Sequence, residues 1–205
     1  MLSEDIVRYC APTMACIKTG SMFNCLYQSR QEMIGKLRIL NRMLRTRGMR
    51  IVPLRWKDGR VLIYLYRPEM LAEDLLAPAA LQLLCECGYS CGNPERCIVQ
   101  LMARLRENGE FPHEIGLFLG YPPADVDGFM HRKDEWKICG LWKVYDDVES
   151  ATKQFMRCRR CTQEYMRRFE GGCSLSSLAV AGKYYWHHFI LTASSGKSKM
   201  KMKEY

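Results

Sequence analysis

Residues 51–66 read IVPLRWKDGRVLIYLY, in which two apolar runs flank the pair Asp58-Gly59. An Asp-Gly pair in this setting is a strong hairpin signal, because both central residues of a tight turn must accept a positive φ angle. We therefore expect strands over residues 51–56 and 60–66. The second run is apolar on both of its faces, which predicts a central strand that is covered on both sides of the sheet.

Helix signals lie on both sides of this hairpin. Ser29 and Glu32 form a capping box, and the apolar residues after them recur at helical spacing, so residues 30–46 should form an amphipathic helix. Residues 139–145 are expected to form one further strand. First-turn prolines and three-four apolar spacing predict further helices, over 69–76, 79–87, 94–108, 111–120, 123–131 and 148–169, and Ser174 caps a last short one.

These elements indicate an α+β fold, in which several amphipathic helices pack on a small, mostly antiparallel sheet with a central hairpin. The length of 205 residues and the 48% of hydrophobic residues suit one domain with a real core. We expect that domain to cover residues 1–183. Residues 184–205 would then be a C-terminal extension, basic and flexible at its end.

Two classes of protein are disfavoured by the apolar pattern. No run approaches the roughly 20 apolar residues of a membrane span, and Glu4 and Asp5 stand where a secretory signal would be basic and then apolar. We therefore expect a cytoplasmic protein without membrane association. In that compartment the eleven cysteines should stay reduced, and their odd number also argues against a closed disulfide framework.

The net charge of +9 is concentrated in two segments. Between Arg30 and Arg60, ten Lys or Arg residues stand against two acids, and residues 197–205 hold four Lys and one Glu. The remainder of the chain is close to neutral. Such a local excess is typical of a solvated face or of a docking surface for an acidic partner, either an acidic protein or nucleic acid.

Residues 112–131 also fit the pattern of a helix-turn-helix motif, with Gly120 at the turn and residues 123–131 as the recognition helix. The exposed positions of that second helix would include Asp125 and Asp127. Carboxylates repel phosphates, and no side chain there offers a good bidentate contact to a base. We therefore rank nucleic acid behind the other partners.

Four cysteines are spaced C-x-C-x3-C-x5-C, at Cys85, Cys87, Cys91 and Cys97. Four thiolates within so short a segment could hold a zinc ion or an iron–sulfur cluster. The spacing differs from the paired C-x2-C knuckles of most structural zinc sites. Cys85 and Cys97 also fall on apolar helix faces, so that burial in the core is the competing interpretation.

Five short motifs follow one another along the chain: CAPT at 10–13, KTGSMF at 18–23, YLYRP at 64–68, FPHEIG at 111–116 and CGLWKVY at 139–145. Together they resemble the bacterial domain-of-unknown-function family 3793, found mainly in anaerobic Firmicutes, over about residues 5–180. The resemblance implies a bacterial cytoplasmic protein and implies no particular activity. The cysteine cluster at 85–97 and the tail after Lys183 lie outside the family's pattern.

Polar residues interrupt these motifs, and we hypothesise that they converge on one pocket. Two lysines beside a helix N-terminus would favour a phosphate or a carboxylate. The expected ligand-binding residues are Lys18, Thr19, Ser21, Lys143 and Tyr145, and the expected catalytic residues, for proton transfer or metal ligation, are His113 and Glu114. The competing interpretation is structural, with Lys143 on the solvent face of a strand and Glu114 complementing the helix dipole.

The sequence thus favours a protein that binds a small anionic ligand or cofactor, with or without catalysis. One alternative is an interaction module for nucleic acid or an acidic protein, which would use the basic 30–60 face or the segment 112–131. The other is a metal or redox protein built on the cysteines. The identity of the ligand or cofactor and the oligomeric state are left open by the sequence.

Overall fold

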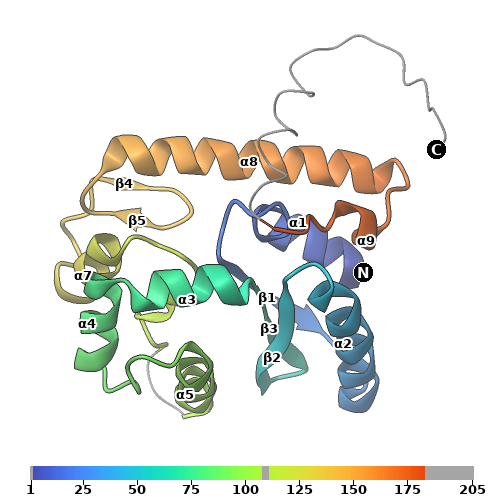
Figure 1. The fold of residues 1–205 in the computed structure, drawn as a ribbon, viewed down its shortest axis with the longest axis horizontal. Helices are drawn as coiled ribbons and strands as arrows, with labels where there is room; N and C mark the ends of the chain where they lie inside the picture. The colour runs from blue at the N-terminus through green and yellow to red at the C-terminus, as the bar shows by residue number, and fades with distance from the viewer. Residues whose placement is uncertain (1, 108–110, 183–205) are drawn as a thin grey trace, which may run out of the picture.

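A three-stranded antiparallel sheet lies at the centre of the structure, a computed structural model that describes residues 2–107 and 111–182 (Figure 1). Its strands are β1 (Gly20–Leu26), β2 (Arg50–Lys57) and β3 (Arg60–Tyr66), in the order β1-β3-β2. The predicted hairpin is confirmed, and Asp58 and Gly59 both have a positive φ angle in its turn. The predicted α+β class is confirmed as well.

Helices account for most of the remaining described chain. The structure confirms the predicted helices within a few residues at each end, except that α6 is much shorter than expected because residues 111–114 precede it as a loop. The helices after the first are α2 (Arg30–Arg45), α3 (Pro68–Leu76), α4 (Pro78–Glu86), α5 (Pro94–Arg106), α6 (Ile115–Phe118), α7 (Pro123–His131), α8 (Val148–Glu170) and α9 (Leu175–Leu178). The expected tail over 184–205 lies outside the described residues.

Two N-terminal elements have no counterpart among the sequence expectations. The helix α1 spans Leu2–Met14, and β1 pairs antiparallel with β3 along its whole length. Pro12 near the end of α1 and the polar residues within β1 obscure both periodicities in the sequence. Tertiary pairing with β3 therefore decides that residues 20–26 are a strand.

The expected strand over residues 139–145 is wrong. The segment turns back on itself, so that β4 (Ile138–Cys139) pairs antiparallel with β5 (Lys143–Val144). Gly140 donates its N–H to the carbonyl of Trp142 inside the turn, and the ring of Phe155 lies against Gly140 where a Cβ atom would stand. Packing against α8 thus places a tight turn where the sequence pattern predicts one continuous strand.

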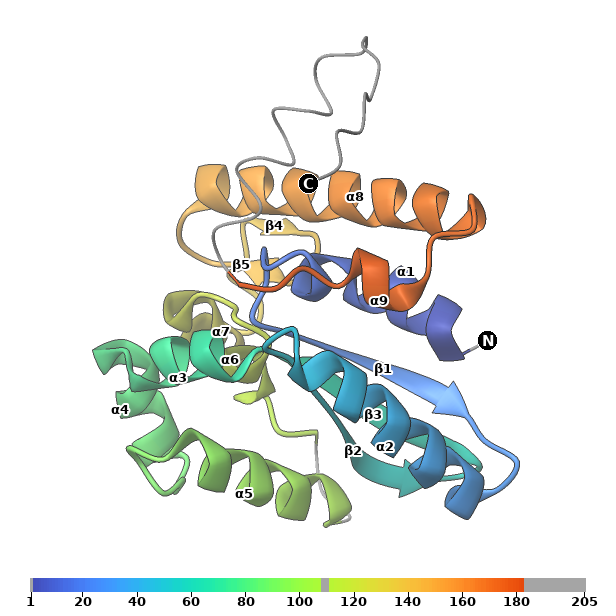
Figure 2. The same ribbon diagram turned by 45° about the vertical axis from the view of Figure 1, so that its right-hand side comes forward.

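Two hydrophobic clusters cover the two faces of the sheet. Figure 2 shows α1, α8 and α9 above the strands and α5 below them. One cluster joins α1, α2, α8 and α9 to one face, and the other joins α3, α4, α5, α6 and α7 to the opposite face. Along β3 the side chains alternate strictly, with Val61, Ile63 and Leu65 in the first cluster and Leu62, Tyr64 and Tyr66 in the second. The prediction of a central strand covered on both sides is confirmed.

Arg67 follows β3 directly and is buried, with 3% of its surface exposed. Its Nε donates to the carbonyl of Thr13 at 2.7 Å, and its Nη2 donates to the carbonyls of Met14 and Val180, each at 2.7 Å. Its Nη1 donates to the carbonyl of Arg47 at 3.3 Å. Because the last carbonyls of a helix lack partners within that helix, the guanidinium satisfies the end of α1 and ties it to the sheet.

We expect Arg67→Met to lower the free energy of unfolding by about 3–5 kcal/mol, because it leaves several buried carbonyls without donors at about 1–3 kcal/mol each. Urea unfolding followed by circular dichroism measures this loss. The exposed Arg45 on α2 provides the control, and Arg45→Met should change the value by less than about 0.5 kcal/mol. Equal effects of the two substitutions would contradict the role of Arg67.

Candidate functional site

A pocket of about 400 Å³ lies between the loop before α6, the helix α7 and the β4–β5 hairpin. It brings together two segments that are distant in sequence, the FPHEIG and CGLWKVY motifs. Most of its lining is apolar or aromatic, which is usual for small-molecule sites. The lining residues are Phe111, His113, Ile115, Gly116, Tyr121, Asp125, Val126, Phe129, Trp142 and Lys143.

Glycines allow the elements around the pocket to approach closely. A Cβ atom on Gly116 would lie 2.8 Å from Cγ2 of Val126, so that only glycine lets α6 meet α7 at this point. The turn between the two helices contains Gly120, whose φ angle of 71° is unfavourable for residues with a side chain. Gly116 and Gly120 therefore allow α6 and α7 to pack closely and to form one wall of the pocket.

Asp125 anchors the hairpin to α7. It is 3% exposed, and its carboxylate accepts hydrogen bonds from Nε1 of Trp142 at 2.7 Å and from the backbone N–H groups of Tyr145 and Asp146 at 2.7 and 3.1 Å. The expectation that Asp125 is exposed on a recognition helix is therefore wrong. The β4–β5 hairpin covers this face of α7, and N–H groups of the hairpin segment occupy the acceptor sites of the carboxylate.

Lys143 and His113 are the two basic side chains that line the pocket. The Nζ of Lys143 lies 5.7 Å from the ring centre of Phe129 and 5.5 Å from that of Trp136. Within the described residues, no carboxylate lies at ion-pair distance from this ammonium group. The ring of His113 packs edge-on against Phe129, with 5.0 Å between centres. Both nitrogen groups thus flank one aromatic side chain of the wall.

Glu114 is next to His113 in sequence but turns away from the pocket. It is buried, and its Oε1 accepts hydrogen bonds from the hydroxyl of Tyr89 at 2.9 Å and from Nη1 of Arg104 at 3.3 Å. Burial and the nearby carboxylate of Glu114 raise the pKa of Tyr89, so its hydroxyl stays a donor. The structure therefore places Glu114 in a buried network behind α6 and does not bring it to the pocket lining.

Lys18 lies behind the pocket wall. Its Nζ is 5.1 Å from the ring centre of Tyr121, which in turn stacks on Trp142 with 4.8 Å between centres. Burial lowers the pKa of Lys18 to about 8, because the charged ammonium loses water. Lys18 thus supports an aromatic pair of the wall without lining the pocket itself.

The three remaining expected ligand-binding residues make internal hydrogen bonds. Thr19 donates its hydroxyl to the carboxylate of Asp74, and the hydroxyls of Ser21 and Thr13 form a buried pair at 2.9 Å. Tyr145 donates its hydroxyl to the carbonyl of Lys133 at 3.2 Å. These residues hold neighbouring elements together and do not line the pocket.

Sequence reasoning missed the aromatic lining and its acidic anchor. Residues 111–142 hold six aromatic residues in 32 positions, about 19%, in a chain that is 11% aromatic, and four of the six line the pocket: Phe111, Tyr121, Phe129 and Trp142. That local enrichment was the available signal. Nothing in the sequence distinguishes the buried Asp125 from the half-buried Asp127, because only the packing of the hairpin separates their surroundings.

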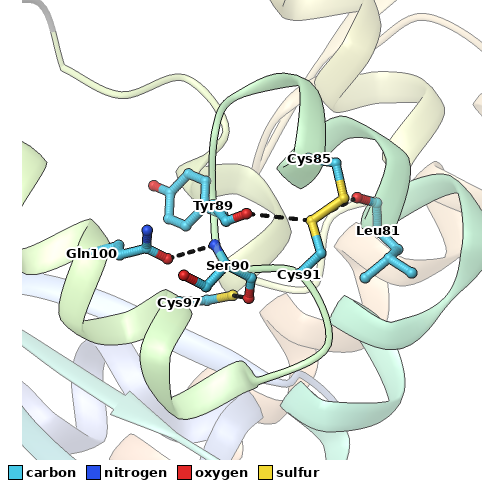
Figure 3. Close-up of a disulfide and its surroundings, with 7 residues drawn as sticks. All are labelled: Leu81, Cys85, Tyr89, Ser90, Cys91, Cys97 and Gln100. Atoms are coloured by element: carbon cyan, nitrogen blue, oxygen red, sulfur yellow. Dashed lines mark hydrogen bonds between the residues drawn. A yellow bond between two sulfur atoms is a disulfide. The ribbon is translucent and has the colours of Figure 1, made fainter.

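The cysteine cluster contains a disulfide bond between Cys85 and Cys91, shown in Figure 3. The expectation that all cysteines stay reduced is therefore wrong. The turn after α4 brings the two Cα atoms to 5.8 Å, a distance that a disulfide spans without distortion of the backbone. Cys87 and Cys97 remain thiols. In the described part of the chain, no three His, Cys, Asp or Glu side chains are grouped so that they could hold a metal ion.

We expect Asp125→Asn to lower the free energy of unfolding by about 2–3 kcal/mol, because an amide cannot replace the carboxylate toward three N–H donors. The emission of Trp142 should also shift, since its indole N–H loses its acceptor. The control is Asp127→Asn, which removes only an exposed contact with His131 and should cost about 0.5 kcal/mol or less. Urea unfolding and tryptophan fluorescence measure both effects.

Comparison with known proteins identifies the family of this chain. No curated protein and no solved structure matches the chain. None of the helices in the described part of the chain combines the length and the apolar character that crossing a bilayer requires. A family model described as "Protein of unknown function (DUF3793)" matches residues 6–179, which include every motif around the pocket. The chain therefore belongs to the DUF3793 family.

Proposed function

We propose that this protein binds a small molecule in the pocket between α6, α7 and the β4–β5 hairpin. The molecule would have an apolar aromatic ring system and one anionic group. One observation carries the proposal: an apolar pocket of about 400 Å³ holds, at Lys143, an ammonium group with no ion-pair partner in the described chain. The volume is in the range of small-ligand sites.

The positions of the aromatic and the basic residues in the pocket lining suggest how such a ligand would lie. The aromatic side chains Phe111, Tyr121 and Trp142 offer area for a ring system. Lys143 would pair with a carboxylate, phosphate or sulfonate, and His113 beside it could donate or accept a hydrogen bond. Glu114 takes no part in this arrangement, so a general acid–base pair of His113 and Glu114 is not part of the proposal.

Two fluorescent probes separate the contribution of apolar contacts to the binding affinity from the contribution of the charge. We expect 1-anilinonaphthalene-8-sulfonate, which is anionic, and N-phenyl-1-naphthylamine, which has the same ring system without the sulfonate, both to bind the pocket. Lys143→Met should weaken the sulfonate probe about tenfold and leave the neutral probe unchanged. Fluorescence titration measures both affinities.

Lys153→Met is the matched control for this titration, because Lys153 is exposed on α8 and pairs with Glu149. It should change neither affinity. The proposal fails if Lys143→Met binds the sulfonate probe as tightly as the wild type does, or if neither probe binds the native protein.

A specific observation favours a second candidate function, which is docking of an acidic protein on α2. Arg38, Arg42 and Arg45 are exposed on this helix, and among the described residues no carboxylate lies at ion-pair distance from them. Ile39 stands among them with 70% of its surface exposed. Protein interfaces commonly combine arginines with an apolar centre, whereas binding to a phosphate backbone needs no apolar side chain.

A labelled peptide of repeated Glu-Glu-Leu-Leu tests this surface. Reversing Arg38, Arg42 and Arg45 to Glu should weaken its binding by at least about tenfold. The charge-matched control reverses Arg157, Arg159 and Arg160 on α8 and should have little effect. Anisotropy titrations at several salt concentrations measure both. Tighter binding of a labelled single-stranded DNA than of the peptide would favour nucleic acid instead.

A further inference from the structure

The Cys85–Cys91 disulfide lies at the surface, where thiols in solution can reach it. Both cysteines are exposed, one at the end of α4 and the other in the turn before α5. The loop that the bond closes contains Gly88, whose φ angle is 74°, and Gly92 follows it with a φ angle of 89°. Backbone of this kind changes conformation easily once its covalent link is opened.

Tyr89 lies within the closed loop, as Figure 3 shows, and its side chain is buried, with 5% of its surface exposed. Its ring is 5.8 Å from that of Phe118 and is covered by the guanidinium of Arg104 at 4.4 Å. Its hydroxyl donates to Glu114, as described above. The disulfide therefore closes the loop around Tyr89, whose hydroxyl connects this loop to Glu114 at the start of α6. Arg104 makes a second connection, because it donates to the carbonyl of Cys87 in the loop and to Glu114.

Glu114 connects Tyr89 to the residues of the pocket wall. Its carbonyl accepts the N–H of Leu117 at 3.0 Å and so begins the short helix α6. The residues on either side of it, His113 and Ile115, line the pocket. A contiguous path through the loop backbone, the buried hydrogen bond from Tyr89 and the backbone at Glu114 thus joins the exposed disulfide to the pocket wall.

We propose that Cys85–Cys91 is a reversible thiol–disulfide exchange site, reduced by dithiols in solution, and that its redox state sets the order of the α6 wall. The part that concerns ligand affinity rests on the proposed function of the pocket. The part that concerns the wall does not, since it can be measured without a ligand.

The exchange is a balanced two-electron step. A thiolate of the dithiol attacks one sulfur of the bridge, the S–S bond breaks, and the other cysteine leaves as a thiolate that takes up a proton. The second thiol of the reductant then attacks the mixed disulfide and releases the first cysteine. The products are two cysteine thiols in the protein and one disulfide in the reductant, and the reverse sequence restores the bridge.

The neighbouring cysteines do not compete in this exchange. Burial raises the pKa of the thiols of Cys87 and Cys97, which keeps both protonated and poorly nucleophilic. Cys97 also donates its S–H to the carbonyl of Ser90. The bridge is therefore opened by an external thiolate, and its cysteines re-form the same pair.

The experiment uses the full-length protein in buffers of oxidised and reduced dithiothreitol. Alkylation followed by peptide mass spectrometry reports the state of Cys85 and Cys91, and hydrogen exchange over residues 111–119 reports the order of the α6 wall. We expect the bridge to open and close reversibly, and reduction to speed exchange in that segment about fivefold.

Three variants identify the path. Cys91→Ser should exchange at the rate of the reduced protein in either buffer. Tyr89→Phe, which removes only the hydroxyl and leaves the contacts of Arg104 with Cys87 and Glu114, should reduce the difference between the two buffers at least about twofold. Cys173→Ser, at an exposed free cysteine, should behave as the wild type does.

Each outcome decides between the two proposals. Unchanged hydrogen exchange on reduction, or a redox difference that is as large in Tyr89→Phe as in the wild type, would overturn the inference. So would a bridge that dithiothreitol cannot open in the folded protein. If the redox difference appears but neither naphthalene probe binds, the proposed function fails and the exchange site stands.

Discussion

The buried guanidinium of Arg67 is the interaction on which the arrangement of elements around the sheet depends. A charged group away from water is tolerated only if its donors are satisfied, and here the partners are backbone carbonyls. Those carbonyls belong to the end of α1, the turn after α2 and the segment after α9. Burial lowers the pKa of Arg67 from its ordinary high value, and the four hydrogen bonds favour its charged form. Three segments far apart in sequence are thereby fixed to the end of β3.

Asp125 lies on the other side of the sheet. It is a buried carboxylate that accepts hydrogen bonds from N–H groups, whereas Arg67 is a buried cation that donates them. The KTGSMF motif contacts both hydrophobic clusters, since Phe23 belongs to the first and Met22 packs against the second. Thr19 reaches Asp74 on α3, and Gly20 leaves room for the ring of Tyr64 beneath it. Thr19, Ser21 and Tyr145 thus have a structural explanation, since each makes a hydrogen bond to another element of the fold.

The pocket and the disulfide share one short helix. With only four residues, α6 makes few hydrogen bonds of its own, so its order depends on what packs against it. On one side it forms the wall of an apolar pocket, and on the other side it is held by Tyr89 through Glu114. A local change at either side therefore reaches the other through the same few atoms, which is how short elements couple neighbouring sites.

The hairpin, the central strand and the helices from α2 onward could be predicted from the sequence, because turn chemistry, helix caps and apolar periodicity are local properties. The rest depends on contacts between distant segments. Pairing with β3 makes a strand of residues 20–26, and the ring of Phe155 against Gly140 splits residues 139–145 into a hairpin. The same reason separates the expected site residues. Lys143 and His113 line the pocket, while Glu114 and Thr19 are turned to partners elsewhere in the fold. The motifs identify which polar residues stand among apolar ones. Which of these residues face a cavity follows from tertiary packing, because it depends on what covers each element.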